Sequence, residues 1–165
     1  KKFIDERIAS LSGAIGCIYV GGNSDVEQKE KFDRVDDSIC AVRSALEQGI
    51  VVGGGLALYN VAKMLLKLKI EDKNKSTARY ILAQSIVAPF ERILINAGID
   101  PDSIKLTDNK NYGFDVKREK YGDLFKLGVI DPLKVTKNAF VNAVSVATTI
   151  LSTNAIVTHA RVGKN

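Results

Sequence analysis

The sequence has few of the residues that most often carry chemistry at neutral pH. Its 165 residues include one histidine, two cysteines, one methionine and no tryptophan. With His159 alone, the chain can form neither a histidine-based catalytic triad nor a histidine cluster for a metal ion. Cys17 and Cys40 have no metal-binding spacing and are too few for a disulfide framework, so we expect reduced, partly buried thiols in a cytoplasmic protein.

Long apolar runs and a targeting signal are also missing. No apolar run approaches the roughly 18 residues that span a bilayer, so we expect a soluble protein without a membrane partner. The chain starts at Lys1 without an initiator methionine or a signal-peptide pattern, and we interpret it as a piece of a longer protein. A hydrophobic content of 45% is typical of a globular chain with a packed core.

The net charge of +5 does not come from a basic patch. The densest basic stretch, residues 67–75, is interrupted by Glu71 and Asp72. No aromatic side chains alternate with its lysines, as a stacking platform for bases would require. We therefore interpret this stretch as a solvated loop and expect no nucleic-acid partner.

The spacing of apolar residues predicts a mainly α-helical fold with a few short β-strands and no alternation of strands and helices. The longest predicted helix covers 25–48, with an apolar stripe that includes Val35 and Ile39. Ser24 and Glu27 have the spacing of a capping box at its start. The other predicted helices cover 3–12, 56–68, 76–88, 89–97 and a segment from Asp131 to about 152, and short strands are predicted at 14–20 and 155–158.

Proline, glycine and capping residues predict where these helices begin and end. Ser76 is the expected cap of the helix at 76–88, and Pro89 is expected to break it because proline lacks an N–H and clashes with the preceding turn. Gly98 is the expected stop of the following helix. Asp131 and Pro132 form a strong helix start, since aspartate caps and proline suits the first helical position.

Gly53, Gly54 and Gly55 open a predicted helix directly after an apolar segment. Glycines allow close backbone approach, and a helix N-terminus attracts anions such as phosphate. The same run also suits a hinge or a tight packing turn. It matches neither the Walker loop nor the Rossmann fingerprint, so its role stays open at this point.

Three aspartates gather on the long predicted helix. Asp33 and Asp37 share a face, and Asp36 lies next to them. Asp37 points away from the apolar stripe and is therefore open to a ligand or to solvent. Spacing alone favours a solvated charged face for these three aspartates. For Asp131 it favours a simple helix cap.

The order of these features resembles one family. Residues 29–58 (KEKFDRVDDSICAVRSALEQGIVVGGGLAL) are similar to a segment of the group I chaperonins. In that family a long helix with an Arg-Val-Glu-Asp core leads through Glu-Glu-Gly into Val-Val-Ala-Gly-Gly-Gly-Val-Ala-Leu. Three more segments agree in the same order: APFERILINAG (88–98), NYGFDVKREKYGDLFKLGVIDPLKVTKNA (111–139) and SVATTILST (145–153).

The resemblance implies a domain organisation. Residues 1–12 would be the tail of a substrate-binding apical domain, 13–48 a segment of an intermediate domain, and 49–165 the C-terminal half of an ATP-binding equatorial domain. Gly13 and Gly49 would be the pivots at the two ends of the intermediate segment. The full-length protein would be an ATP-driven folding machine with unfolded protein clients, a co-chaperonin lid and double heptameric rings.

The resemblance also implies roles for single residues. Asp37 takes the place of the family's catalytic aspartate, Gly54 that of its nucleotide-contacting glycine, and Asp131 that of the carboxylate that holds the ribose. Residues 115–117 replace a usual Asn-Ala-Ala beside the nucleoside, which leaves backbone contacts to the nucleotide. The candidate residues for binding ATP or ADP are therefore Gly53, Gly54, Gly55, Asp115, Val116, Lys117 and Asp131.

Other parts of the family's pattern are not among these 165 residues. They are the phosphate loop Gly-Asp-Gly-Thr-Thr-Thr, the magnesium aspartate and a Thr-Leu-Gly-Pro segment, all of which belong to the N-terminal half. We therefore expect the Mg²⁺ ligand in that half and no ATPase activity from this chain by itself. Residues 152–154 replace a usual Thr-Thr-Glu, and Thr158-His159 replaces Thr-Asp. A stand-alone helical binding module without catalysis remains the alternative.

Overall fold

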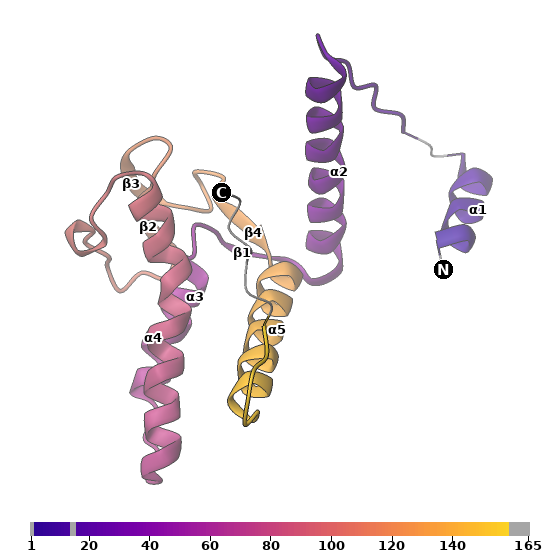
Figure 1. Ribbon diagram of the computed structural model, residues 1–165. Helices are drawn as coiled ribbons and strands as arrows, with labels where there is room; N and C mark the ends of the chain where they lie inside the picture. The colour runs from indigo at the N-terminus through magenta and orange to yellow at the C-terminus, as the bar shows by residue number, and fades with distance from the viewer. Residues whose placement is uncertain (1, 14–15, 159–165) are drawn as a thin grey trace, which may run out of the picture. The chain divides into compact units, whose positions relative to one another are not determined.

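The computed structural model describes residues 2–13 and 16–158, and these are mainly helical, as the apolar spacing predicts (Figure 1). The chain divides into two units, Lys1–Cys40 and Ala41–Asn165, and the division falls within the long helix α2. None of the helices in the described ranges has the length and apolar character needed to cross a membrane.

The first unit contains α1 (Lys2–Ser12) and most of α2 (Asp25–Gln48), and both agree with the predicted helices. The strand predicted at 14–20 is wrong for residues 16–20, which form no strand, and 14–15 lie outside the described ranges. β-Branched residues favour a strand only where another strand exchanges backbone hydrogen bonds with them. Within the described part of the chain, no strand pairs with this segment.

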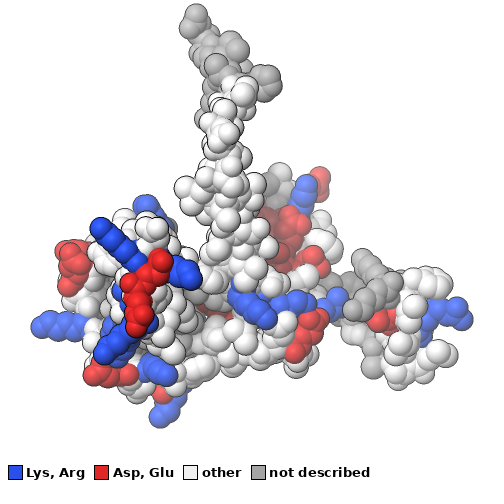
Figure 2. All heavy atoms as spheres, turned by 90° about the horizontal axis from the view of Figure 1, so that it is seen from below, with Lys and Arg blue, Asp and Glu red and all other residues white. Residues whose placement is uncertain are grey.

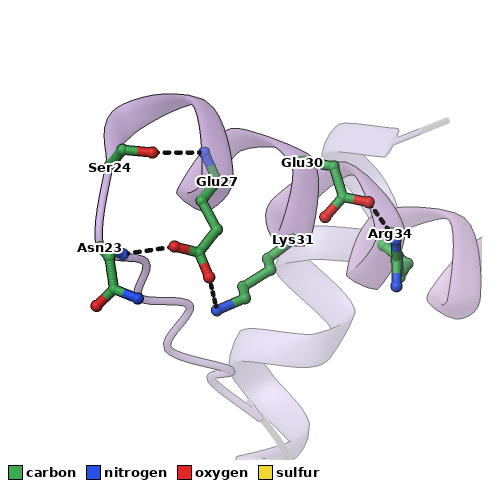
Figure 3. A network of polar contacts seen from close by, with 6 residues as sticks. All are labelled: Asn23, Ser24, Glu27, Glu30, Lys31 and Arg34. Carbon is green, nitrogen blue, oxygen red and sulfur yellow. Dashed lines mark hydrogen bonds and ion pairs between the residues drawn. The ribbon is translucent and has the colours of Figure 1, made fainter.

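Side chains at the start of α2 satisfy backbone groups that the helix leaves unpaired (Figure 3). Oγ of Ser24 accepts a hydrogen bond from the backbone N–H of Glu27 at 3.3 Å. The Glu27 carboxylate accepts one from the backbone N–H of Asn23 at 2.8 Å and pairs with Nζ of Lys31 at 2.7 Å. The predicted capping box is therefore confirmed, although its return bond reaches the residue before the cap.

The second unit combines two antiparallel two-stranded sheets with three helices. β1 (Ile50–Val52) pairs with β4 (Ile130–Pro132), and β2 (Tyr112–Asp115) pairs with β3 (Lys120–Asp123). α3 (Leu56–Lys67) and α4 (Lys73–Asn96) lie side by side, the 3-10 helix η1 (Pro101–Ser103) follows α4, and α5 (Leu133–Leu151) follows β4 (Figure 1). The β1–β4 pairing brings the glycine run beside the segment that precedes α5.

Two small apolar clusters hold the second unit together. The first joins β1, the start of α3 and the turn after β3 through Val52, Leu56 and Leu124. The second lies between α3 and α4 and consists of Ala62, Ala83 and Ile86, with Phe140 of α5 packed against it. Apolar burial of this kind is the main force that holds the helices in place.

α4 begins and ends at well-formed caps, and one of them differs from the prediction. Asp72, and not Ser76, is its N-cap: the Asp72 carboxylate accepts a hydrogen bond from the backbone N–H of Lys75 at 2.8 Å, and Ser76 lies inside the first turn. Gly98 follows the C-terminus with a φ of 74°, as predicted. The N–H of Ile99 donates to the Leu94 carbonyl at 2.9 Å, which completes a Schellman motif.

The break predicted at Pro89 is wrong, because α4 runs through this residue without interruption. Ala83 and Ile86 before the proline and Phe90 and Leu94 after it are buried at helical spacing on one side. A continuous helix buries all four side chains together, and this gain outweighs the local cost of the proline.

Two predictions near the end of the chain are also wrong. Asp131 does not cap α5: it lies in β4 opposite Val51, and Pro132 is the N-cap, without a side-chain hydrogen bond. Because Asp131 and Pro132 pair with β1 in the β1–β4 ladder, the helix begins only at Leu133. Residues 155–158 form no strand, and His159 lies outside the described residues.

Several apolar side chains stay exposed in the described residues. On α2, Val42 and Leu46 are 59% and 83% exposed, and on α5 Val135 and Leu151 are exposed as well. Cys17 and Cys40 are exposed, which corrects the expectation that they are partly buried. Amphipathic spacing predicts a face that can be buried, but only a neighbouring element can cover it.

Candidate functional site

A pocket of about 380 Å³ lies in the second unit. Four segments that are far apart in the sequence form it: the glycine run, the C-terminal half of α4, the turn after β2 and the turn after β3. The residues that line it are Gly54, Phe90, Ile93, Leu94, 114–118 and 127–129. The candidate residues Gly54, Asp115, Val116 and Lys117 therefore meet at one pocket, whereas Gly53, Gly55 and Asp131 do not line it.

The three glycines of the run 53–55 have different neighbours, and only Gly54 lines the pocket. A Cβ on Gly53 would lie 3.0 Å from N of Ile130, and a Cβ on Gly55 would lie 2.7 Å from Cα of Phe90. Gly54 has a φ of 66°, and a Cβ there would meet only Cγ1 of Val129, at 3.8 Å. Gly53 and Gly55 are thus packing glycines, and Gly54 is the one with space in front of it.

Asp115 is a buried carboxylate at the end of β2, with 3% of its surface exposed. One of its oxygens accepts hydrogen bonds from the backbone N–H groups of Lys117 (3.0 Å) and Arg118 (3.2 Å). The other pairs with Nη1 of Arg118 at 2.7 Å. The Arg118 guanidinium holds the pKa of the Asp115 carboxyl below its ordinary value. With three donors on this carboxylate, the Asp115 side chain is occupied within the turn, and Val116 and Lys117 are the residues of the turn that remain to contact a ligand.

Asp131 has the opposite electrostatic environment. It is partly buried in β4, and no hydrogen bond or ion pair reaches its side chain from the described residues. Burial alone raises the pKa of its carboxyl above the ordinary value, because a charged form out of water is disfavoured. An unpaired, partly buried carboxylate of this kind, two residues after the pocket-lining Val129, is well suited to accept hydrogen bonds from ligand hydroxyl groups.

Asp37 lies in the first unit, on α2. Its side chain is exposed, and it shares one face of the helix with Lys29, Asp33 and Arg34. Asp36 is exposed as well. Asp37 is therefore accessible to solvent and to any group that approaches this face.

Positive and negative side chains are mixed on the face that Figure 2 shows, where lysine and arginine side chains alternate with aspartate and glutamate. In residues 2–13 and 16–158, no cluster of three or more histidine, cysteine, aspartate or glutamate side chains could hold a metal ion. What the pocket offers to a ligand is thus a glycine with open space, apolar side chains of α4 and the backbone of one turn.

Sequence reasoning missed two parts of this site. Arg118 was not a candidate, although its spacing of three residues from Asp115 was a usable signal, since a short turn brings such a pair together. For the wall formed by 127–129, the only sequence signal was Gly128, a residue type that allows the φ of 75° found there. The fold brings this wall to the pocket through the β1–β4 pairing.

A comparison with protein-family models adds one finding. The model described as the TCP-1/cpn60 chaperonin family matches residues 3–161, which is almost the whole chain.

Proposed function

The chain belongs to the TCP-1/cpn60 chaperonin family of protein-folding chaperones, and from this premise we propose that it works as the C-terminal part of a group I chaperonin driven by ATP. One observation carries the proposal. Gly54 and the turn 115–117, which the sequence resemblance assigns to the nucleotide, lie far apart in the chain and line the same pocket.

The lining residues of this pocket, together with Asp131 two positions after the lining residue Val129, suit a nucleoside in three ways. Gly54 has space for close approach of the nucleotide, and the apolar side chains of α4 can contact a flat base. The backbone N–H of Val116 and the backbone carbonyls of Val116 and Lys117 can bind the edge of the base, since the N–H of Lys117 already donates to Asp115. Asp131 can accept hydrogen bonds from the ribose hydroxyl groups, which would supply the partners that its carboxylate lacks.

Asp37 is proposed to orient and polarise the attacking water. Phosphoryl transfer requires a water in line with the leaving group and neutralisation of the phosphate charge, more than it requires covalent help. Magnesium would supply that neutralisation, with its ligand in the N-terminal half. An exposed carboxylate on a long helix can reach the water when the domains close over the nucleotide.

The proposed closing motion needs pivots at the ends of the intermediate segment. Gly13 and Gly49 have φ values of 67° and 85°, and a Cβ on either would meet no atom within 4 Å. Open space around a glycine lets its backbone dihedrals change without a clash. In this proposal, 1–12 belong to the apical, 13–48 to the intermediate and 49–165 to the equatorial domain.

As a member of this family, the protein acts on client proteins and works in oligomeric rings. We propose that the rings are double heptamers, that a co-chaperonin closes them and that they work in the cytoplasm. The chain by itself is proposed to be inactive, because its 165 residues lack the sequence of the phosphate loop.

The test is ATP turnover by the full-length protein with Asp37→Ala, and Asp36→Ala is the matched control. Both residues are exposed on the same helix, so the two changes remove the same charge from neighbouring positions. We expect Asp37→Ala to lower kcat by about 100-fold or more while nucleotide binding persists. Asp36→Ala should stay close to the parent.

Equal rates for the two variants would rule out the catalytic role of Asp37. If the full-length parent neither binds nor hydrolyses ATP, the alternative of a binding module without catalysis would replace the proposal. Magnesium-dependent turnover by the 165-residue chain alone would contradict the proposed need for the N-terminal half.

A further inference from the structure

Arg118 joins two walls of the pocket through a single nitrogen atom. Its Nη1 donates to Oδ2 of Asp115 at 2.7 Å and to the backbone carbonyl of Leu127 at 2.9 Å. Asp115 is the last residue of β2, directly before the turn 116–119, and Leu127 belongs to the turn after β3. Both turns line the pocket, so this guanidinium connects the two sides of the space between them.

The turn that carries Arg118 needs such a restraint. It connects Asp115 to Lys120, which face each other at the end of the β2–β3 ladder. Glu119 within it has a φ of 52°, a conformation that residues with a Cβ rarely adopt. The Asp115 carboxylate shapes the first half of the turn by accepting the N–H groups of Lys117 and Arg118. Its second oxygen is then directed to the guanidinium.

We propose that Asp115 and Arg118 are positioning residues for the nucleotide: their ion pair and the bond to Leu127 hold the 115–118 wall at a set distance from the 127–129 wall. This role rests on the proposed function and adds to it two side chains that support the nucleotide site without touching the nucleotide. Asp115 acts through the backbone of Val116 and Lys117, which forms the binding surface.

The inference predicts which kinetic constant changes. Loss of the ion pair would let the two walls separate, and this would weaken contacts to the nucleotide equally in the ground state and in the transition state. A loss of uniform binding raises KM and leaves kcat unchanged. Since about half of the Arg118 side chain is exposed, the effect is expected to be moderate.

The experiment uses ATP turnover and the binding of fluorescent ADP in the full-length protein. Arg118→Met removes the guanidinium but keeps the turn. Asp115→Asn keeps an oxygen for the two backbone N–H groups and loses the ion pair. Arg118→Lys keeps a charged donor. Arg92→Met is the matched control, because Arg92 is exposed on α4 and does not line the pocket.

We expect Arg118→Met and Asp115→Asn each to raise the KM for ATP by about two- to fivefold, with kcat unchanged. The double variant should be no worse than the stronger single one, since both changes remove the same ion pair. Arg118→Lys should restore part of the parent KM, and Arg92→Met should match the parent. Amide hydrogen exchange should become faster at 116–118 and at 127–129 together.

Three results would overturn the inference, and they separate it from the proposed function. If the parent binds ATP and Arg118→Met keeps the parent KM, the positioning role alone fails. A fall in kcat without a rise in KM would assign the pair to another step and would also contradict this role. If the parent does not bind ATP, the proposed function and the role that rests on it fail together. If Arg118→Met does not fold, the KM values for ATP of Asp115→Asn and Arg118→Lys decide: a parent KM in Asp115→Asn would overturn the positioning role.

Discussion

Each glycine of the 53–55 run has a different neighbourhood, although the three are indistinguishable in the sequence. Gly55 lies against the backbone of α4, Gly53 against the backbone of β4, and Gly54 has only the tip of Val129 nearby. A helix axis and a strand cannot move aside for an added methyl group as easily as a side chain can. Substitution at these three positions therefore tests packing and binding separately.

Gly55→Ala is predicted to lower the free energy of unfolding by about 2–4 kcal/mol, because its Cβ would lie 2.7 Å from Cα of Phe90 and its φ is 76°. Gly54→Ala adds the backbone strain without the clash and should cost about 1–2 kcal/mol. Urea unfolding of both variants measures the difference. Equal losses would show that the close approach of Gly55 to α4 does not contribute.

Asp131→Asn is predicted to change stability and nucleotide binding in opposite directions. Burial raises the pKa of Asp131 in the folded state, so folding favours its protonated form. The stability that this carboxyl contributes is complete below the pKa of an unfolded aspartate, ~4, and is lost as pH rises through the raised folded pKa. At neutral pH the asparagine variant should be more stable, by less than about 1 kcal/mol since the group is only partly buried.

The measurement is the midpoint of thermal unfolding of parent and Asp131→Asn at several pH values. The two midpoints should coincide near pH 3 and separate as pH rises. In the full-length protein the same substitution should weaken ADP binding by about three- to tenfold, because an amide accepts hydrogen bonds less strongly than a carboxylate. A variant that is less stable at pH 7 would contradict the unpaired state of the carboxylate.

At the scale of an element, α4 shows how tertiary packing overrides a local preference. Pro89 lacks the N–H that would bond to the carbonyl four residues earlier, yet the helix continues through it. The buried side chains lie on both sides of the proline, at Ala83, Ile86, Phe90 and Leu94. A break would tilt one half of the helix away from α3 and expose some of these buried side chains to solvent.

Pro89→Ala is therefore predicted to raise the free energy of unfolding by about 1–3 kcal/mol, because it restores a helical hydrogen bond and Pro89 itself is exposed. Guanidinium unfolding, followed by the helical circular dichroism signal, measures the change. Ala88→Gly, at the preceding exposed position, should lower the same quantity by about 1 kcal/mol and serves as the control. A destabilised Pro89→Ala variant would mean that the proline holds a bend that the fold requires.

At the scale of the whole molecule, the exposed apolar faces distinguish this chain from a typical monomeric domain. On α5, Val141, Val146 and Ile150 are about half exposed, and Leu151 is 85% exposed. Exposed apolar side chains in this number commonly mark a surface that associates with other protein. We expect the 165-residue chain to bind apolar dyes and to self-associate in solution.

Val146→Glu is predicted to reduce dye fluorescence and light scattering of the chain, because it places a charge at an exposed apolar position of α5. Asn142→Glu adds the same charge to α5 at a residue that is already polar, and it should change both signals much less. Since Val146 is 59% exposed, its substitution should leave the free energy of unfolding within about 0.5 kcal/mol of the parent. Equal effects of the two variants would show that net charge, and not the exposed apolar side chains, controls association.

The sequence by itself was sufficient for the bounds of α2 and for the end of α4, since periodicity, caps and glycine stops act within about one turn of the chain. The bounds of α2, its capping box and the stop at Gly98 follow from residues three or four positions apart. The candidate residues and their proposed roles came from the order of motifs along the chain. That order also led to the family that the match over residues 3–161 establishes.

Only the tertiary structure decided how these residues meet. In the folded chain Asp131 lies in a strand and α4 continues through Pro89. Gly53 and Gly55 pack against backbone while Gly54 does not, and the Asp115 carboxylate pairs with Arg118. Each of these outcomes depends on a partner that is brought close by the fold, whether a strand, a packed helix or the opposite wall of a pocket. Local sequence rules hold no information about such partners, because the free energy of burial and pairing is released only when the distant segments come together.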